Sequence, residues 1–216
     1  GTVRSARVRW PVQPIAGAAV AGLAIVNLPA LWTGAFVDSA IDRDEHPPQA
    51  WLDAADALDA SGTRGRVLQV PGAEFGAFTW GYTVDQPLPG LTDKPVVTRD
   101  LLPLGSPGAM DLLFALDDRM QDGVLEPGSV APVSRWLGAD TIWVAHDLDV
   151  ERFRTALPES VDEVLDDAPG IGPARDFGPV VLRAVEAGGT IARAGGRAVV
   201  VSGSGDGLVD LAAAGV

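Results

Sequence analysis

The chain has 216 residues, a formal net charge of −13 and no cysteine. This acidity excludes nucleic acid as a partner, because phosphate binding requires clustered Lys and Arg. The absence of cysteine excludes disulfides and thiolate metal sites, and two histidines leave little for a histidine metal site. The length allows one or at most two domains. Because the chain starts at Gly1 and ends within an apolar segment, we expect a piece of a longer protein, truncated at its C-terminus.

A stretch of 28 residues near the N-terminus, Trp10 to Val37, carries no charge. Crossing a bilayer requires about 20 apolar residues in a helix, since lipid offers the backbone no hydrogen-bond partners. We therefore predict one transmembrane helix over Ile15–Phe36, kinked by Asn27 and Pro29. One alternative is a cleavable signal peptide, but its apolar core has about 7–15 residues and is shorter than this stretch. A buried core helix is the other alternative, because many residues of the stretch are small.

The charges on the two sides of this stretch differ in sign. Three arginines precede it, and four acidic residues with a single arginine follow it: Arg4, Arg7 and Arg9 before, and Asp38, Asp42, Arg43, Asp44 and Glu45 after. By the positive-inside rule the N-terminus is cytoplasmic. The sequence thus predicts a cytoplasmic flank and membrane helix at 1–37 and an extracytoplasmic domain at 38–216, held at the plasma membrane.

Helical and extended patterns alternate along the second part. In chain order we predict a helix between Pro47 and Gly62, a strand at Arg66–Val70, a loop at 71–105, a helix from Ser106 to Met120, a helix at Val130–Leu137, a strand at Thr141–Val144, a short helix from Asp149 to Leu157, strands at Val180–Val185 and Arg197–Val201, and a last helix after the glycine turn at 203–207. This alternation favours an α/β layered domain, with α+β as the alternative.

The segment 71–106 concentrates aromatic and charged residues: Phe75, Phe78, Trp80 and Tyr82 with Glu74, Asp85, Asp93, Arg99 and Asp100. Aromatic faces stack on sugar rings, and carboxylates and guanidinium groups bond hydroxyls, so this composition is compatible with a glycan-binding surface. The substrate-binding candidates are Trp80, Tyr82, Asp85 and Arg99. The alternative is a long loop whose aromatic residues fill a small core of their own.

Other candidate sites carry less chemistry. Adjacent residues on a helix do not face each other, so neither Asp117–Asp118 nor Asp166–Asp167 is suited to act as an acid/base dyad. We predict that both pairs are solvated. No metal ligand is assigned; a divalent cation such as calcium stays open, although no EF-hand spacing occurs. Gly203-Ser-Gly-Asp-Gly207 does not have its third glycine at the spacing of a dinucleotide-binding turn, and a tight turn explains the segment as well. For His146 we predict a loop hydrogen bond.

Several segments together resemble the actinobacterial α-(1→3)-arabinofuranosyltransferases of the AftD type. They are RVLQVPGAEFGAFTWGYTVDQPLPGLTDKPVVTRDLLPLGS, ALDDRMQDG, WLGADTIWVAHDLDVERFR and VVVSGSGDGLVDLAAAG, of which the first is the most specific. The resemblance implies a parent membrane enzyme of the GT-C class. It would take arabinofuranose from a polyprenyl-phosphate donor, contact membrane lipid and extend cell-wall arabinan.

The same resemblance implies that this segment is non-catalytic by itself. Enzymes of the GT-C class carry their catalytic carboxylate in an early exterior loop, so no catalytic residue is carried over to this sequence. Two other functions are compatible with the residues alone. One is a single-span envelope protein whose exterior domain binds glycan or protein, and the other is a soluble Rossmann-type enzyme with the uncharged stretch as buried core.

Overall fold

The computed structural model describes residues 12–34, 36, 46–100, 105–153, 157–186 and 200–215. The chain divides into two compact units, Gly1–Asp42 and Arg43–Val216. The flanking charges on which the predicted orientation rests, together with Trp10, lie outside the described residues.

The first unit contains two helices, α1 (Val12–Val26) and α2 (Ala30–Thr33). The helical segment predicted over Ile15–Phe36 is interrupted between Val26 and Ala30, where the sequence predicts a kink, so a single membrane-spanning helix is not confirmed. Pro29 lies between the helices and lacks the N–H that would bond to the carbonyl of Ile25, four residues earlier. Side chains add hydrogen bonds at the break: Asn27 Nδ2 donates to Leu23 O at 2.8 Å, and Trp32 Nε1 donates to Ile25 O, the carbonyl to which Pro29 cannot donate, at 3.2 Å. Among the described residues, no helix combines the length and the apolar character that a membrane crossing needs.

The second unit is built on a five-stranded sheet of order β4-β1-β5-β7-β6. The strands are β1 (Arg66–Val70), β4 (Val96–Val97), β5 (Ala139–Ala145), β6 (Arg175–Asp176) and β7 (Val180–Ala184). Strands β4, β1 and β5 run parallel, whereas β7 is antiparallel to β5 and β6 is antiparallel to β7. The predicted mixture of helix and sheet is confirmed, and the antiparallel strands make the sheet a mixed one.

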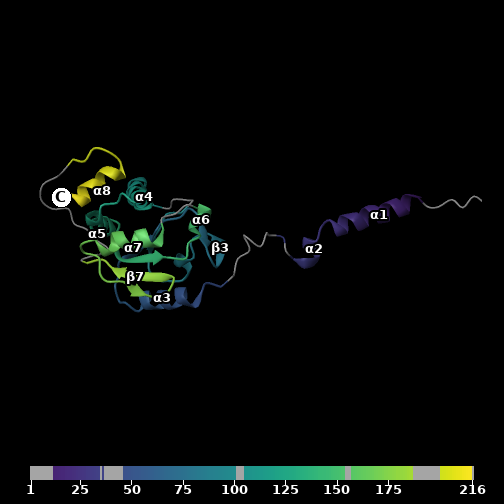
Figure 1. Cartoon of the computed structure of the whole chain (residues 1–216), viewed down its shortest axis with the longest axis horizontal. Helices are drawn as coiled ribbons and strands as arrows, with labels where there is room; N and C mark the ends of the chain where they lie inside the picture. The colour runs from purple at the N-terminus through teal and green to yellow at the C-terminus, as the bar shows by residue number, and fades with distance from the viewer. Residues whose placement is uncertain are drawn as a thin grey trace, which may run out of the picture. The chain divides into compact units, whose positions relative to one another are not determined.

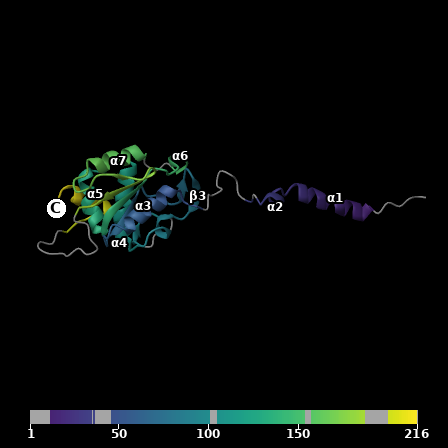
Figure 2. The same cartoon turned by 90° about the horizontal axis from the view of Figure 1, so that it is seen from below.

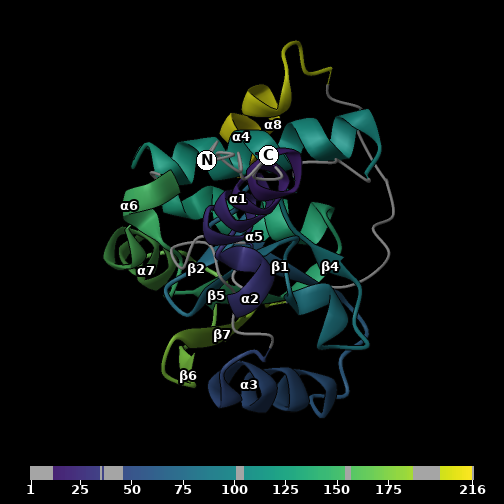
Figure 3. The same cartoon turned by 90° about the vertical axis from the view of Figure 1, so that its right-hand side faces the viewer.

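Helices cover both faces of this sheet (Figures 1 and 3). Helix α3 (Gln49–Asp59) lies on one face, and Figure 2 views the second unit from the side of α3. The opposite face carries α4 (Pro107–Gln121), α5 (Pro127–Trp136) and α7 (Pro158–Asp166), and α8 (Gly205–Ala213) packs on α4 and α5. The α3 face buries Trp51 and Leu58 against Trp143 of β5 and Val67 of β1.

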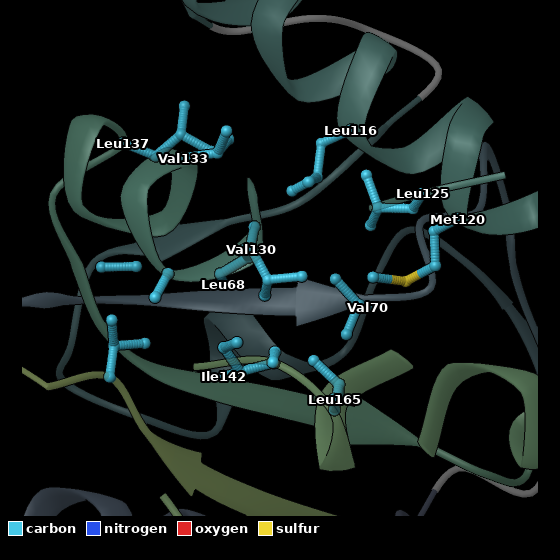
Figure 4. Packing of buried hydrophobic residues seen from close by; sticks show 14 of the residues in the cluster. Leu68, Val70, Leu116, Met120, Leu125, Val130, Val133, Leu137, Ile142 and Leu165 are labelled. Atoms are coloured by element: carbon cyan, nitrogen blue, oxygen red, sulfur yellow. The ribbon is translucent and has the colours of Figure 1, made fainter. Parts of the chain in front are cut away.

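The core on the other face is larger and almost entirely aliphatic (Figure 4). Alternate residues of β1 and β5, Leu68, Val70 and Ile142, point toward α4 and α5. They meet side chains from the helices and from the connection after α4: Leu116, Met120, Leu125, Val130, Val133, Leu137 and Leu165. This packing fixes α4 beside β1, which positions the residues of the candidate site.

The remaining elements are short. A hairpin of β2 (Gly76–Phe78) and β3 (Gly81–Val84) and a 3-10 helix, η1 (Leu88–Gly90), form most of the ordered structure between β1 and β4. Helix α6 (Val150–Phe153) follows β5, and residues 154–156 lie outside the described part. Helix α7 (Pro158–Asp166) is not among the helices predicted from the sequence, although Pro158 at its start and Val161 and Leu165 at helical spacing indicate it. Most of the strand predicted at Arg197–Val201 lies outside the described residues.

Candidate functional site

The carboxyl ends of the three parallel strands meet at one edge of the sheet. Strand β1 leads there into Pro71 and Gly72, β4 into Thr98 and Arg99, and β5 into His146 and Asp147. Ligands of open α/β sheets bind beside this edge, because loops from neighbouring strands converge there. The predicted binding residues belong to loops or to the hairpin that follow β1 and β4, so the search for a site begins at this edge.

A cavity of about 300 Å³ opens beside the ends of β1 and β4. Its lining comes from the segment after β1, the residue after β4 and helix α4: Gly72, Ala73, Glu74, Phe75, Arg99, Asp118 and Gln121. The volume is at the lower end of the roughly 300–1,000 Å³ typical of small-molecule sites. Of the four residues predicted from sequence, Arg99 lines this cavity.

Asp117 of α4 anchors the cavity from behind, with its side chain only 3 % exposed. Its carboxylate accepts hydrogen bonds from the Gly72 N–H at 2.6 Å, from Gln121 Nε2 at 2.7 Å and from Arg99 Nη1 at 3.0 Å. Gly72 fits because it has no side chain: a Cβ there would lie 2.7 Å from Arg99 Cβ and 2.8 Å from Asp117 Oδ2. The network ties the ends of two strands to α4.

Burial and hydrogen bonds act against each other on the pKa of Asp117. Burial raises the pKa of this carboxyl above its ordinary value, although the Gly72 N–H and Arg99 act in the opposite direction. For the Arg99 guanidinium, burial lowers the pKa, but hydrogen bonds to Asp118 and Asp117 outweigh it and the pKa is raised. The Arg99 guanidinium is therefore charged near neutral pH, and the Asp117 carboxyl that it contacts is largely removed from water.

Arg99 contacts two further acidic side chains and one ring. Its Nη1 donates to Asp118 at 2.5 Å, and Nη2 lies 3.7 Å from Glu74. The guanidinium also lies 4.9 Å from the ring centre of Phe114. Asp118 is exposed as predicted, but the prediction that Asp117 is solvated is wrong. Helix geometry separated the two side chains correctly; the sequence did not show that Gly72 and Arg99 cover one of them.

Tyr82 and Asp85 lie on the hairpin side of the segment. The ring of Tyr82, on β3, lies 6.4 Å from that of Phe75, which lines the cavity. Asp85 is exposed and affects Asp100: burial raises the pKa of Asp100, and the negative charge of Asp85 raises it further. Tyr82 is thus one ring removed from the cavity, whereas no contact joins Asp85 to Arg99 among the described residues.

Trp80 lies in an aromatic cluster that also contains Trp51, Phe78 and Trp143. It stacks on Phe78 at 5.0 Å with the ring planes 8° apart, and it meets Trp51 edge-on at 6.0 Å. The indole N–H groups of Trp51 and Trp80 both donate to Asp147 Oδ2 at 2.8 Å. Burial raises the pKa of Asp147, and the two indole hydrogen bonds act in the opposite direction. Trp80 therefore joins the hairpin to the core beneath it.

The other predicted features have structural partners. His146 Nε2 lies 3.1 Å from Asp162 Oδ2 of helix α7, so its polar contact is to a helix and is not the predicted loop hydrogen bond. The Gly205 N–H donates to Asp111 of α4 at 2.5 Å, so the glycine turn seats α8 directly on α4. The pair Asp166–Asp167 is exposed as predicted. Within the described ranges, no group of three or more His, Asp or Glu side chains is arranged to hold a metal ion.

A second cavity of about 420 Å³ lies between β4 and the start of α4. Its walls are largely apolar, with Val96 and Val97 on one side and Met110 and Leu113 on the other. Asp100 and Gly105, which also line it, flank residues 101–104, outside the described part. The smaller cavity is the better site candidate, because charged and polar groups converge on it at the strand ends.

Comparison with known proteins gives a family for the chain. Residues 2–202 match the model of the α-(1→3)-arabinofuranosyltransferase N-terminal GT-C domain. The chain is 37 % identical over 135 residues to the α-(1→3)-arabinofuranosyltransferase of Mycolicibacterium smegmatis, and 36 % identical over 138 residues to that of Mycobacterium tuberculosis. Each match covers 62 % of this chain and 10 % of the relative, so the chain spans about a tenth of their length.

Solved structures give the same result. Two cryo-EM structures of the mycobacterial arabinofuranosyltransferase AftD, the first of a point mutant, match with TM-scores of 0.68 and 0.67 and sequence identities of 30 % and 28 %. Both matches cover 85 % of this chain and 16 % of the solved chain. The likeness thus extends to most of the fold described above.

Proposed function

The chain belongs to the family of α-(1→3)-arabinofuranosyltransferases with an N-terminal GT-C domain, and we propose that it is a non-catalytic segment of such an enzyme that faces the saccharide acceptor. The parent transfers arabinofuranose from a polyprenyl-phosphate donor to cell-wall arabinan. The family match over residues 2–202 supports the glycosyltransferase assignment. The donor, the acceptor and the non-catalytic role are part of the proposal, because the chain corresponds to a tenth of its relatives.

In this proposal, residues 1–37 form a cytoplasmic flank and a segment in the plasma membrane, and residues 38–216 lie on the extracytoplasmic side. Large exposed apolar side chains on α1, among them Val20 and Leu23, support contact with lipid. The arginines before Trp10 and the acidic residues after Val37 support the orientation. A cysteine at the exposed Asp122 then reacts with an impermeant maleimide in intact cells, and labelling only after lysis contradicts the orientation.

The observation that carries the acceptor-facing role is the cavity at the carboxyl ends of β1 and β4. It combines an arginine, two exposed carboxylates and an aromatic ring, the groups that bond sugar hydroxyls and stack on sugar rings. Trp80 and Tyr82 are the two predicted residues that could stack on a sugar ring. Tyr82 lies beside the cavity, whereas Phe78 occupies one face of Trp80. For hydroxyl bonding, Arg99 lines the cavity and Asp85 lies outside its lining.

The test uses the parent enzyme with Tyr82→Ala, Tyr82→Phe and a control, Trp136→Ala. Trp136 is an exposed aromatic residue of α5 and does not line the cavity. An exposed stacking contact contributes about 1 kcal/mol, so Tyr82→Ala raises the acceptor KM about fivefold while Tyr82→Phe and Trp136→Ala leave it unchanged. Kinetics and a thermal melt of each variant are compared. An unchanged KM, or a loss of activity that follows the melting temperature, contradicts the proposal.

A further inference from the structure

We infer that the cavity at the ends of β1 and β4 receives an uncharged furanose residue of the acceptor and excludes the phosphate of the donor, with Glu74, Asp118 and Arg99 setting this preference. The inference rests on the proposed function, because it takes arabinofuranosyl transfer as the reaction of the parent. It adds to that function which of the two substrates the cavity selects, and by which side chains.

The charge balance of the cavity opposes a phosphate. Three carboxylates, those of Glu74, Asp117 and Asp118, lie within 3.7 Å of the single guanidinium of Arg99. Arginine binds phosphate best when it offers two parallel N–H donors. Nη1 of Arg99 already donates to Asp117 and Asp118, so an entering phosphate meets a neutralised arginine and two exposed carboxylates of its own sign.

The same groups suit a neutral sugar. Ionised carboxylates only accept hydrogen bonds, and sugar hydroxyls are donors that can satisfy them. The side chains of Glu74 and Asp118 are 56 % and 58 % exposed, so both can reach a ligand. Phe75, which is half-buried in the lining, offers an apolar surface for the face of a furanose ring.

The cavity is held in this form before a ligand arrives. Asp117 fixes the position of Arg99 and of the backbone at Gly72. Gln121 Nε2 donates both to Gly72 O at 3.0 Å and to Asp117 at 2.7 Å, which holds the wall on the α4 side. A site whose polar groups are already oriented spends little binding free energy on ordering them, and this favours recognition of a small ligand.

The experiment uses the 216-residue chain in detergent and two soluble probes that differ in charge. They are the methyl glycoside of α-arabinofuranose and α-arabinofuranose 1-phosphate, titrated up to about 10 mM, the range of weak complexes. Binding is followed by saturation-transfer NMR and tryptophan fluorescence. The double variant E74Q/D118N removes both exposed carboxylates, and E163Q/D167N makes the same charge change on exposed residues at α7.

The wild-type chain is expected to bind the methyl glycoside at least tenfold more tightly than the 1-phosphate. E74Q/D118N weakens binding of the methyl glycoside about tenfold, since two charge-assisted hydrogen bonds are replaced by neutral ones. The same variant reduces the difference in affinity between the methyl glycoside and the 1-phosphate. E163Q/D167N behaves as wild type. No binding of the methyl glycoside, tighter binding of the 1-phosphate, or equal behaviour of the two double variants overturns the inference.

The proposed function is judged separately by the Tyr82 series in the parent enzyme. If Tyr82→Ala impairs acceptor use while E74Q/D118N binds the methyl glycoside as wild type does, the inference fails and the proposed function stands. If Tyr82→Ala leaves acceptor use unchanged, the proposed function fails whatever the probes show.

Discussion

Asp117 and Asp147 are both buried carboxylates near the carboxyl ends of the parallel strands, but different donors satisfy them. Asp147 receives two neutral indole N–H groups, from Trp51 on α3 and Trp80 in the hairpin. Asp117 receives a guanidinium, a backbone N–H and a side-chain amide. Burial raises the pKa of both.

The difference separates a folding role from a ligand-facing role. Around Asp147 both side-chain donors belong to an aromatic cluster, so its carboxylate holds the hairpin on the core. Around Asp117 one donor, Arg99, also lines a cavity, so this carboxylate holds a cation where a ligand can reach it. Removing Asp147 should thus cost more stability, and removing Asp117 should also alter the cavity.

The largest effect is expected for Asp147→Ala. It leaves the N–H groups of Trp51 and Trp80 without their acceptor, and Trp51 is fully buried. An unsatisfied buried donor costs about 1–3 kcal/mol, so the free energy of unfolding should fall by about 3 kcal/mol. Urea unfolding followed by tryptophan fluorescence measures this. The exposed Asp167→Ala is the control, and a loss below about 1 kcal/mol would mean that water replaces the carboxylate.

A smaller loss, about 2 kcal/mol, is expected for Asp117→Asn. The amide keeps one oxygen, but its NH₂ group faces the donors of Gly72, Gln121 or Arg99. Asp118→Asn is the matched control, one residue away on the same helix. Because Asp118 is 58 % exposed, its ion pair contributes about 0–1 kcal/mol. Equal losses for the two variants would remove the distinction between a buried and an exposed partner of Arg99.

Local patterns in the sequence predicted much of the framework. The spacing of Trp51, Ala55 and Leu58 predicted α3, and these residues are buried on one face. The runs at Arg66–Val70 and Thr141–Val144 predicted β1 and β5, since β-branched residues between turn signals form strands. Such signals come from neighbours in the chain, which is why they are readable without a structure.

The partners of the buried carboxylates could not be predicted in that way. Asp117 is 45 residues from Gly72, and Asp147 is 67 residues from Trp80. Helix geometry separated Asp117 from Asp118, but which side becomes buried depends on where β1 and β4 end. Trp80 was correctly placed in an aromatic segment, yet its ring stacks within the protein on Phe78. Contacts between distant segments, rather than composition, decide these roles.

The smallest expected effect is a pH dependence that Asp147→Asn removes. Because burial raises the pKa of Asp147 in the folded state, the folded chain keeps its proton at pH values where the unfolded chain has lost it. Ionisation of this group therefore opposes folding. Its contribution to stability is fully present below the ordinary pKa of 3.8 and is lost as the pH rises through the raised value.

Asparagine does not titrate, and its oxygen can still accept from Trp51 and Trp80. The stability of Asp147→Asn relative to the wild type should thus increase as the pH rises above the ordinary pKa of 3.8 and level off above the raised pKa of Asp147. Asp117, whose pKa burial also raises, is present in both proteins and cancels in the difference. Urea unfolding of the two proteins across this range provides the measurement. If the stability difference between Asp147→Asn and the wild type does not change with pH, the indole hydrogen bonds balance the effect of burial on the pKa of Asp147. If the difference decreases as the pH rises, the indole hydrogen bonds outweigh burial.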